Sequence, residues 1–249
     1  MKATRTAPHP VLSQYYASQD DRQRFVAALF DGAARHYDRL CGVMSLGCGQ
    51  SYRRAVLRRA GLRPGMSLLD VATGTGLVAR SAMSVLGETR AVVGLDPSHG
   101  MLREARKTLS VSLVQGRVED LSFAANRFDL VSMGYALRHV ADLGVAFAEC
   151  RRVLKPEGRL VVLEVSRPRS VVGEWVLRVF LQKVVPLIMR VTTGYAQAGL
   201  ITNYYWDTIA QCVPPAEILE ILRASGFVDV ERRVSRGFLS EYVGIKPAG

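Results

Sequence analysis

The feature that most constrains this chain is the segment LLDVATGTG at residues 68–76, where a short apolar run passes directly into a turn with two glycines. A helical pattern of apolar residues follows at 77–86. Gly74 and Gly76 permit positive φ angles and let a ligand approach the backbone, while the start of the next helix offers unpaired N–H groups. The order of strand, glycine turn and helix therefore predicts an α/β domain with a ligand-binding turn.

The residues after this turn repeat the alternation of short apolar runs with longer helical patterns. Near-continuous apolar strands separated by helices predict a parallel sheet with helices on both faces. The predicted strands are 66–71, 90–95, 110–114, 128–133 and 159–165, and the predicted helices between them are 77–86, 98–109 and 140–154. The C-terminal pattern predicts a helix at 216–224 and an antiparallel pair of strands at 227–234 and 238–245.

The chain shows neither an internal repeat nor a low-complexity linker, which favours a single domain over residues 1–249. Its hydrophobic residues, 49% of the chain, are ample for a continuous core. The expected division is a helical cap at 1–60, a binding core at 61–168, an inserted lid at 169–213 and a C-terminal helix with its strand pair at 214–249.

Two aspartates stand close to the glycine turn, one before it and one a strand later. Asp70 precedes Gly74 in the pattern D-x-x-x-G-x-G, which suits a ligand with an amino-acid end whose ammonium needs an anionic environment. Asp96 ends the second predicted strand, where a carboxylate is placed to accept both ribose hydroxyls of an adenosine. Together the turn and the acid predict an adenosyl ligand with an amino-acid end.

Two other interpretations of this region stay open. In a purely structural one, the glycines serve tight turns and Asp96 caps the helix that starts near Ser98. In the other, the ligand is NAD, because Ala79 completes a G-x-G-x-x-A dinucleotide pattern. The NAD interpretation is weakened because no second nucleotide-binding half with its own catalytic pattern follows.

Charge and cysteine content limit the expected partners. Lys and Arg total 33 against 22 Asp and Glu, a net charge of +11 that favours anionic surfaces. The arginines are spread along the chain without a stripe of interleaved aromatics, so nucleic acid is not an expected partner. The four cysteines form no C-x-x-C pair and the start shows no secretory pattern, which predicts no metal site, no disulfide framework and a cytoplasmic location.

Residues 171–191 are the longest apolar candidate for a membrane span, but they are interrupted by charges and a proline. The interrupting residues are Glu174, Arg178, Lys183, Pro186 and Arg190. These are too many charges for a lipid-exposed helix, so the segment is predicted to be an amphipathic helical cover. Its outer face is open to three interpretations: peripheral contact with the inner face of a membrane, burial in the core, or a homodimer contact.

Three further segments complete a family pattern. They are Tyr37-Asp38 with MSLG at 44–47, YALRHV at 135–140, and RVLKPEGRL at 152–160 leading into LEVSRP at 163–168. With the glycine turn, they make the chain resemble the class I S-adenosylmethionine (SAM)-dependent methyltransferases, and within these the ubiquinone/menaquinone biosynthesis C-methyltransferase family. The resemblance runs from about Phe25 to the C-terminus. It implies a Rossmann-like fold whose mostly parallel seven-stranded sheet has an antiparallel C-terminal strand and helices on both faces.

The resemblance implies SAM as cofactor, S-adenosylhomocysteine (SAH) as product, and no metal. It places Thr75 at the methionine end of SAM, Asp96 on the ribose, and Arg117 beside the adenine. The residues expected to bind the cofactor are Asp70, Thr73, Gly74, Thr75, Gly76, Asp96, Pro97, Met101, Arg117, Val118 and Gly134. This chain departs from the family at four positions, which usually hold His at Gly49, Asn or Asp at Arg117, Ser at Gly134 and Asn at His139.

Methyl transfer from a sulfonium is an in-line displacement in which the protein positions the acceptor and excludes water. A carbon or phenolic acceptor must also lose a proton, and His139 is the predicted general base because histidine titrates nearest neutrality. Arg138 stands where members have an arginine proposed to act through water, and we expect it to stabilise developing negative charge. The tyrosines predicted to line the acceptor pocket are Tyr37, Tyr135, Tyr195 and Tyr204. The alternatives are that His139 caps the next helix and that the tyrosines belong to the core.

The leading interpretation is a methyltransferase of EC class 2.1.1 that acts on a carbon or an oxygen of a small aromatic, quinone-like or polyketide-like acceptor. A SAM-binding protein that uses the cofactor structurally, or for chemistry other than methylation, is the alternative. An NAD-dependent oxidoreductase is the third possibility.

Overall fold

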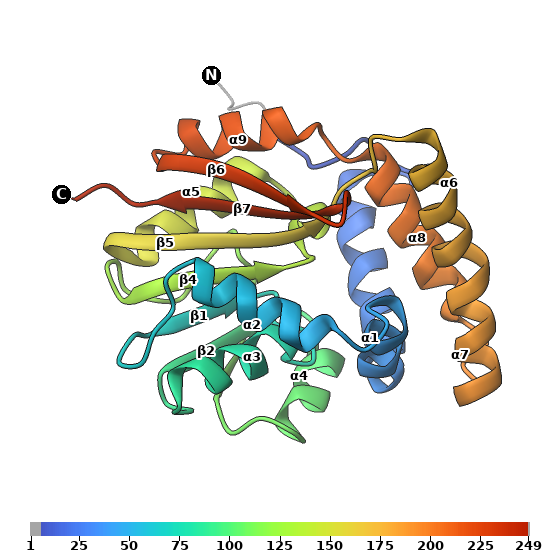
Figure 1. Cartoon of the computed structure of the whole chain (residues 1–249), viewed down its shortest axis with the longest axis horizontal. Helices are drawn as coiled ribbons and strands as arrows, with labels where there is room; N and C mark the ends of the chain where they lie inside the picture. The colour runs from blue at the N-terminus through green and yellow to red at the C-terminus, as the bar shows by residue number, and fades with distance from the viewer. Residues whose placement is uncertain (1–5, 249) are drawn as a thin grey trace.

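The sheet at the centre of the molecule has seven strands in the order β3-β2-β1-β4-β5-β7-β6 (Figure 1). The computed structural model describes residues 6–248, so residues 1–5 of the predicted cap and residue 249 lie outside the described part. The strands are β1 (Leu68–Val71), β2 (Val92–Asp96), β3 (Ser112–Gln115), β4 (Phe128–Gly134), β5 (Leu154–Val165), β6 (Val228–Ser235) and β7 (Leu239–Ile245).

Strand directions confirm the predicted fold class. β1 pairs in parallel with β2 and β4, β2 with β3, and β4 with β5. The last strand, β7, runs antiparallel to both of its neighbours, β5 and β6. Because the first strands are parallel, their carboxyl ends share one edge of the sheet, where the loops that follow them meet.

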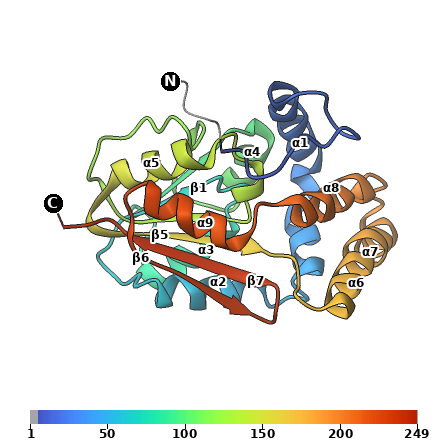
Figure 2. The same cartoon turned by 90° about the horizontal axis from the view of Figure 1, so that it is seen from above.

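Helices cover both faces of the sheet, as Figure 2 shows from above. α2 (Gly49–Arg59) and α3 (Leu77–Leu86) place Leu57 and Ala79 in one core cluster with Leu68 of β1. α4 (His99–Arg106) adds Ala105 to the same cluster. On the opposite face, α5 (Leu143–Val153) and α9 (Pro215–Ala224) pack against β4 and β5 through a second cluster that includes Phe147.

A third group of helices stands at one side of the sheet in both views (Figures 1 and 2). It consists of α1 (Gln19–Met44), α6 (Val171–Val179), α7 (Val185–Thr193) and α8 (Ala198–Gln211). Leu29 and Ala33 of α1 pack against Val185 of α7 and Ile201 of α8 in a core of their own. This group therefore joins the start of the chain to the segment between β5 and α9.

α6 and α7 form one helical arm because the π-helical turn Phe180–Val184 connects them without a break. The predicted amphipathic cover at 171–191 is thus helical throughout. Within residues 6–248, no helix combines the length and the apolar character needed to cross a membrane.

Most predicted boundaries lie within a few residues of the observed ones, and the two largest differences are at the starts of α5 and β5. The helix predicted from residue 140 begins at Leu143, because Leu137–His139 form a separate 3-10 turn and Asp142 caps α5 by accepting a hydrogen bond from Val145 N at 3.1 Å. The strand predicted from residue 159 begins at Leu154, with a shift of register against β4 between Phe128 and Leu130. The division into cap, core, lid and C-terminal part stays a prediction.

Candidate functional site

The glycine turn links the end of β1 to the start of α3. Thr73 N donates to the main-chain oxygen of Leu95 at 2.9 Å, and Gly76 N donates to that of Thr73 at 2.8 Å. Gly74 and Gly76 have φ angles of +58° and +85°. The left-handed φ of Gly76 favours glycine, and a Cβ atom at this position would also meet Leu109 Cδ1.

Asp70, a residue of β1, holds this turn through hydrogen bonds. Its carboxylate accepts hydrogen bonds from Thr73 Oγ1 at 2.6 Å, Ser132 Oγ at 2.7 Å and Ala79 N at 3.2 Å. Burial raises the pKa of Asp70 to about 6, against the effect of these donors. These hydrogen bonds let Asp70 hold the turn, and the ligand ammonium expected beside it stays a prediction.

Asp96 ends β2 and lies against the same turn. Its Oδ2 accepts from Gly74 N at 2.7 Å and its Oδ1 from Ser98 N at 2.8 Å, and burial raises its pKa to about 6. Each carboxylate oxygen can accept a second hydrogen bond, which suits the two adjacent hydroxyls of a ribose. The helix cap is Ser98, whose hydroxyl accepts from Met101 N at 3.0 Å. Asp96 is therefore joined to the glycine turn, in the arrangement that an adenosyl ligand requires.

Three polar side chains of α1 bond to the loops that follow the first three strands. The pairs are Gln23 with Arg117 after β3, Asp31 with Ser98 and Gly100 after β2, and Asp38 with Thr75 after β1. α1 therefore lies across the carboxyl ends of these strands and covers the candidate site. The sequence analysis named Asp38 only as part of a family motif and did not name Gln23 or Asp31, although the spacing of about two helical turns marks the three residues as one face of a helix.

The other predicted cofactor residues lie around the same edge. Met101 and Val118 are 2% and 5% exposed and belong to the interior, whereas Pro97 is exposed. Gly134 ends β4, and a Cβ atom there would lie 2.6 Å from Val78 Cγ2. The serine that the family usually carries at this position would meet Val78, which explains why glycine stands here.

His139 lies in an aromatic cluster at the carboxyl end of β4. Its ring is 5.2 Å from that of Phe30, 5.5 Å from that of Tyr204 and 6.2 Å from that of Tyr205, all measured between ring centroids. Both ring nitrogens are buried, and neither has a hydrogen-bond partner among the described residues. Burial, helped by the charge of Arg138, lowers the pKa of His139 well below its usual 6.5, so the ring is neutral at physiological pH.

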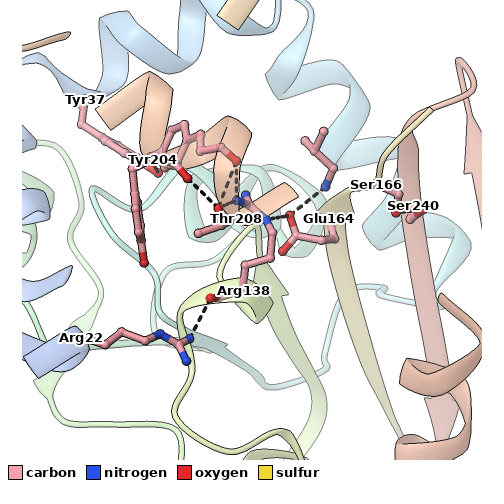
Figure 3. A network of polar contacts seen from close by, with 10 residues as sticks. Arg22, Tyr37, Arg138, Glu164, Ser166, Tyr204, Thr208 and Ser240 are labelled. Carbon is pink, nitrogen blue, oxygen red and sulfur yellow. Dashed lines mark hydrogen bonds and ion pairs between the residues drawn. The ribbon is translucent and has the colours of Figure 1, made fainter. Parts of the chain in front are cut away.

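The Arg138 guanidinium forms hydrogen bonds to neighbouring side chains of the protein, as Figure 3 shows. Its guanidinium donates to Glu164 Oε1 at 3.0 Å and to Thr208 Oγ1 at 2.5 Å, with both charged side chains buried. The buried Arg22 of α1 donates at 2.8 Å to the main-chain oxygens of Arg138 and Val140, which flank His139. Through these contacts, Arg138 and Arg22 hold the turn that carries His139. The sequence analysis named neither Arg22 nor Glu164.

Two of the four predicted tyrosines join the His139 cluster. Tyr204 stacks on the imidazole with an angle of 22° between the rings. Tyr37 accepts a hydrogen bond from the Tyr205 hydroxyl at 3.2 Å, and its Cε1 lies 3.9 Å from the point where a Cβ on Gly74 would be. The aromatic cluster therefore reaches from the glycine turn to His139.

The other two tyrosines lie apart from this cluster. Tyr135 has a φ of +61°, and its ring lies 5.6 Å from the guanidinium carbon of Arg53. Tyr195 stacks on His36 at 4.5 Å between ring centroids and lines a separate cavity of about 180 Å³ with Phe25. The predicted pocket of four tyrosines is thus brought together only in part.

A parallel sheet of this order, with an antiparallel last strand, a glycine turn after β1 and a buried acid after β2, defines the class of SAM-dependent methyltransferases. Solved structures agree on the fold. A SAM-dependent methyltransferase from Thermotoga maritima, described as a possible histamine N-methyltransferase, has a TM-score of 0.62 and 20% identity, covering 88% of this chain and 98% of that one. A putative SAM-dependent methyltransferase from Methanococcus maripaludis has a TM-score of 0.63 and 15% identity, covering 88% and 94%.

The model of the ubiE/COQ5 methyltransferase family matches residues 17–246, and the chain belongs to this family. A demethylmenaquinone methyltransferase from Symbiobacterium thermophilum is 33% identical, covering 92% of this chain and 95% of the relative. A ubiquinone/menaquinone biosynthesis C-methyltransferase UbiE from Shewanella halifaxensis is 31% identical, covering 89% and 90%. The resemblance inferred from the sequence motifs is confirmed.

Proposed function

We propose that this family member transfers the methyl group of SAM to a carbon, or an oxygen, of a small aromatic acceptor of quinone-like or polyketide-like structure, within EC class 2.1.1. The relatives are named for demethylmenaquinone and for ubiquinone and menaquinone biosynthesis, which supports a reduced quinone as the first acceptor to test. The reaction needs no metal, since the sulfonium is already activated for displacement.

One observation carries this proposal. Aromatic side chains connect the glycine turn to a histidine whose two ring nitrogens are buried and have no hydrogen-bond partner in the part of the chain that the structure describes: Tyr37 lies beside Gly74, Phe30 beside Tyr37, and His139 beside Phe30. A flat aromatic acceptor suits such surroundings because aromatic rings stack on one another or meet edge to face. Its hydroxyl can then reach a nitrogen that is otherwise left unsatisfied.

In the proposed mechanism, bound SAM supplies the methyl group as part of a sulfonium. Asp96 accepts hydrogen bonds from the ribose, while α1 covers the site and excludes water. His139 accepts the proton that the acceptor hydroxyl gives up, and this raises the electron density of the aromatic ring for attack on the methyl group. Arg138 and Arg22 keep the His139 turn in place through Glu164 and the flanking main-chain oxygens.

We also propose that the protein works in the cytoplasm and rests its α6–α7 arm on an anionic membrane surface, from which a lipid-tailed acceptor would enter. Exposed apolar residues on the arm support this: Val171, Val172, Trp175, Val176, Leu187 and Val191. Exposed Arg178, Lys183 and Arg190 accompany them, without an exposed acidic residue on α6 or α7. An anionic surface suits this composition better than a homodimer, which would bring the cations of two copies together.

Incubation of the purified protein with methyl-labelled SAM and a set of reduced prenylated benzoquinones and naphthoquinones tests the proposal. We expect SAH to accumulate together with an acceptor whose mass has increased by one methyl group, measured by mass spectrometry. Binding of SAM without methylation of any quinol or phenolic acceptor would contradict it. That result would favour the alternative of a SAM-binding protein with other chemistry, as one fold hosts many reactions.

A further inference from the structure

The segment that precedes α1, residues 6–16, contains neither helix nor strand, and we call it the N-terminal strap. The main-chain oxygen of Thr6 accepts a hydrogen bond from Leu143 N at 2.9 Å, and that of Pro8 accepts one from Val213 N at 2.8 Å. The strap therefore lies across the start of α5 and the loop before α9. It has no task in the mechanism described above.

Two polar side chains of the strap, His9 and Tyr16, are buried, with exposed fractions of 1% and 5%. His9 Nδ1 lies 2.7 Å from the main-chain oxygen of Pro10, so Nδ1 carries the proton of the neutral ring. Burial, helped by the charge of Arg22, lowers the pKa of His9 to about 4, so the ring is neutral at physiological pH. Within residues 6–248, neither His9 Nε2 nor the Tyr16 hydroxyl has a hydrogen-bond partner. The strap thus adds unsatisfied polar groups to the interior without adding a charge.

Arg22 of α1 carries a buried charge whose hydrogen-bond acceptors within residues 6–248 are uncharged. Its guanidinium donates to Gln19 Oε1 at 3.1 Å and to the main-chain oxygens of Arg138 and Val140 at 2.8 Å (Figure 3). Its Nε has no partner in the same part of the chain. Arg138, in contrast, has the carboxylate of Glu164 at 3.0 Å. A buried charge is costly unless an opposite charge accompanies it, so the Arg22 guanidinium suits a ligand anion.

The Tyr204 hydroxyl is buried near these groups and also has no hydrogen-bond partner among the described residues. The Tyr16 and Tyr204 rings both lie against Phe25, with centroids 5.8 Å and 5.3 Å from its ring. Burial raises the pKa of both hydroxyls, and the charge of Arg22 acts in the opposite direction on each of them. Tyr204 in turn stacks on the His139 ring at 5.5 Å. Three donors, Arg22 Nε and the two tyrosine hydroxyls, are therefore grouped beside His139.

An oxyanion suits these three donors better than a neutral group does. A water molecule can accept from the hydroxyls, but it leaves the Arg22 charge without a counter-charge. A carboxylate supplies a negative charge and has acceptor sites on both oxygens for several donors. A phenolate forms only when His139 has taken the proton, whereas the charge of Arg22 is permanent. The geometry therefore favours a ligand group that is ionised before the reaction begins.

We propose that the acceptor is a hydroxylated aromatic carboxylic acid, whose carboxylate is bound by Arg22, Tyr16 and Tyr204 while its hydroxyl faces His139. The proposal rests on the proposed function, because it names the acceptor of the same reaction. Hydrogen bonds to an ionised group are stronger than those between neutral groups, so the acid binds more tightly than a neutral analogue of the same shape. Arg22 and the strap thereby determine which acceptor binds, while His139 remains the base.

Binding of two matched ligands to the full chain isolates this contact. The compounds 4-hydroxy-1-naphthoate and 4-hydroxy-1-naphthamide share the ring and the hydroxyl, but only the first has a carboxylate in place of an uncharged carboxamide. Calorimetry at pH 7.5 measures both ligands on protein saturated with SAH, which prevents turnover. The variants are Arg22→Gln, Tyr16→Phe and Tyr204→Phe, and circular dichroism confirms that each is folded.

Two control variants come from the same segments. Tyr15→Phe removes the hydroxyl of the neighbouring strap tyrosine, which donates to Asp207 at 2.7 Å. Arg24→Gln removes an arginine of α1 whose side chain is 81% exposed. Both variants should bind the two ligands as the wild type does.

We expect the wild type to bind the naphthoate about tenfold or more tightly than the naphthamide, the scale of a hydrogen bond to a charged group. Arg22→Gln should remove this preference, and each tyrosine variant should weaken binding of the naphthoate alone by about tenfold. A wild type without the preference, or an Arg22→Gln variant that retains it, would overturn the proposal. If Arg22→Gln does not fold, unchanged naphthoate binding by both tyrosine variants overturns it.

The proposed function is tested separately from this inference. A protein that binds SAH and methylates a neutral quinol, yet shows no preference for the naphthoate, contradicts the inference and leaves the proposed function standing. A protein that neither binds SAH nor methylates any acceptor contradicts both.

Discussion

At the scale of single residues, two buried carboxyl groups of similar pKa have different tasks. Burial raises the pKa of both Asp70 and Asp96 to about 6. Asp70 is surrounded by side-chain and main-chain donors that tie β1, β4 and α3 together. Asp96 accepts hydrogen bonds only from main-chain N–H groups, and each of its oxygens can accept one more from a ligand. At neutral pH both are ionised, and as the pH falls through 6 the protonated form of Asp96 loses part of its capacity to accept from a ribose.

His139 gives the residue-scale prediction. His139→Ala and His139→Asn are both expected to lower kcat by about a hundredfold at saturating acceptor, the scale of general-base catalysis. Because its pKa lies well below 6.5, His139 is already neutral at pH 7, so its titration adds no loss of turnover between pH 8 and 7. Calorimetry with SAH serves as the control and should show unchanged affinity. Near-normal turnover of both variants would show that another group takes the proton.

At the scale of elements, the π turn between α6 and α7 determines what the arm presents to solvent. Its extra residue rotates α7 relative to α6 by about 100°, compared with an unbroken α-helix. Leu181, Val185 and Met189 thereby stay buried against α1 and α8. The same rotation leaves Trp175 of α6 and Leu187 of α7, 63% and 62% exposed, on one outer stripe.

This stripe predicts membrane binding that can be measured by vesicle co-sedimentation. At physiological salt the wild type should pellet with vesicles containing anionic lipid, and not with neutral ones. Trp175→Ala with Leu187→Ala should weaken binding by more than about tenfold, since each side chain contributes on the order of 1.5 kcal/mol or more when buried. Val234→Ala removes an exposed apolar group from β6 and should have no effect. A wild type that stays in the supernatant with anionic vesicles would remove the membrane proposal.

At the scale of the whole molecule, the alternation of apolar runs and helical patterns was sufficient to predict the sheet, because the central strands β1, β2 and β4 are short and buried. The glycine turn and Asp96 were found for the same reason, since local spacing places them at strand ends. The contacts of α1 were not predictable in this way. Asp31 and Asp38 lie far in sequence from the loop residues that they contact, and only the packing of α1 over the strand ends brings them together.

The glycine turn and Asp96 form the proposed binding site for SAM. Isothermal calorimetry at pH 7.5, above the pKa of about 6 for Asp96, tests it with SAM, SAH and NAD on the wild type and on Asp96→Asn. We expect SAM and SAH to bind, NAD not to bind, and Asp96→Asn to weaken SAH binding by about tenfold to a hundredfold. Binding of NAD alone, no binding of SAM or SAH, or an Asp96→Asn variant with wild-type affinity would contradict it.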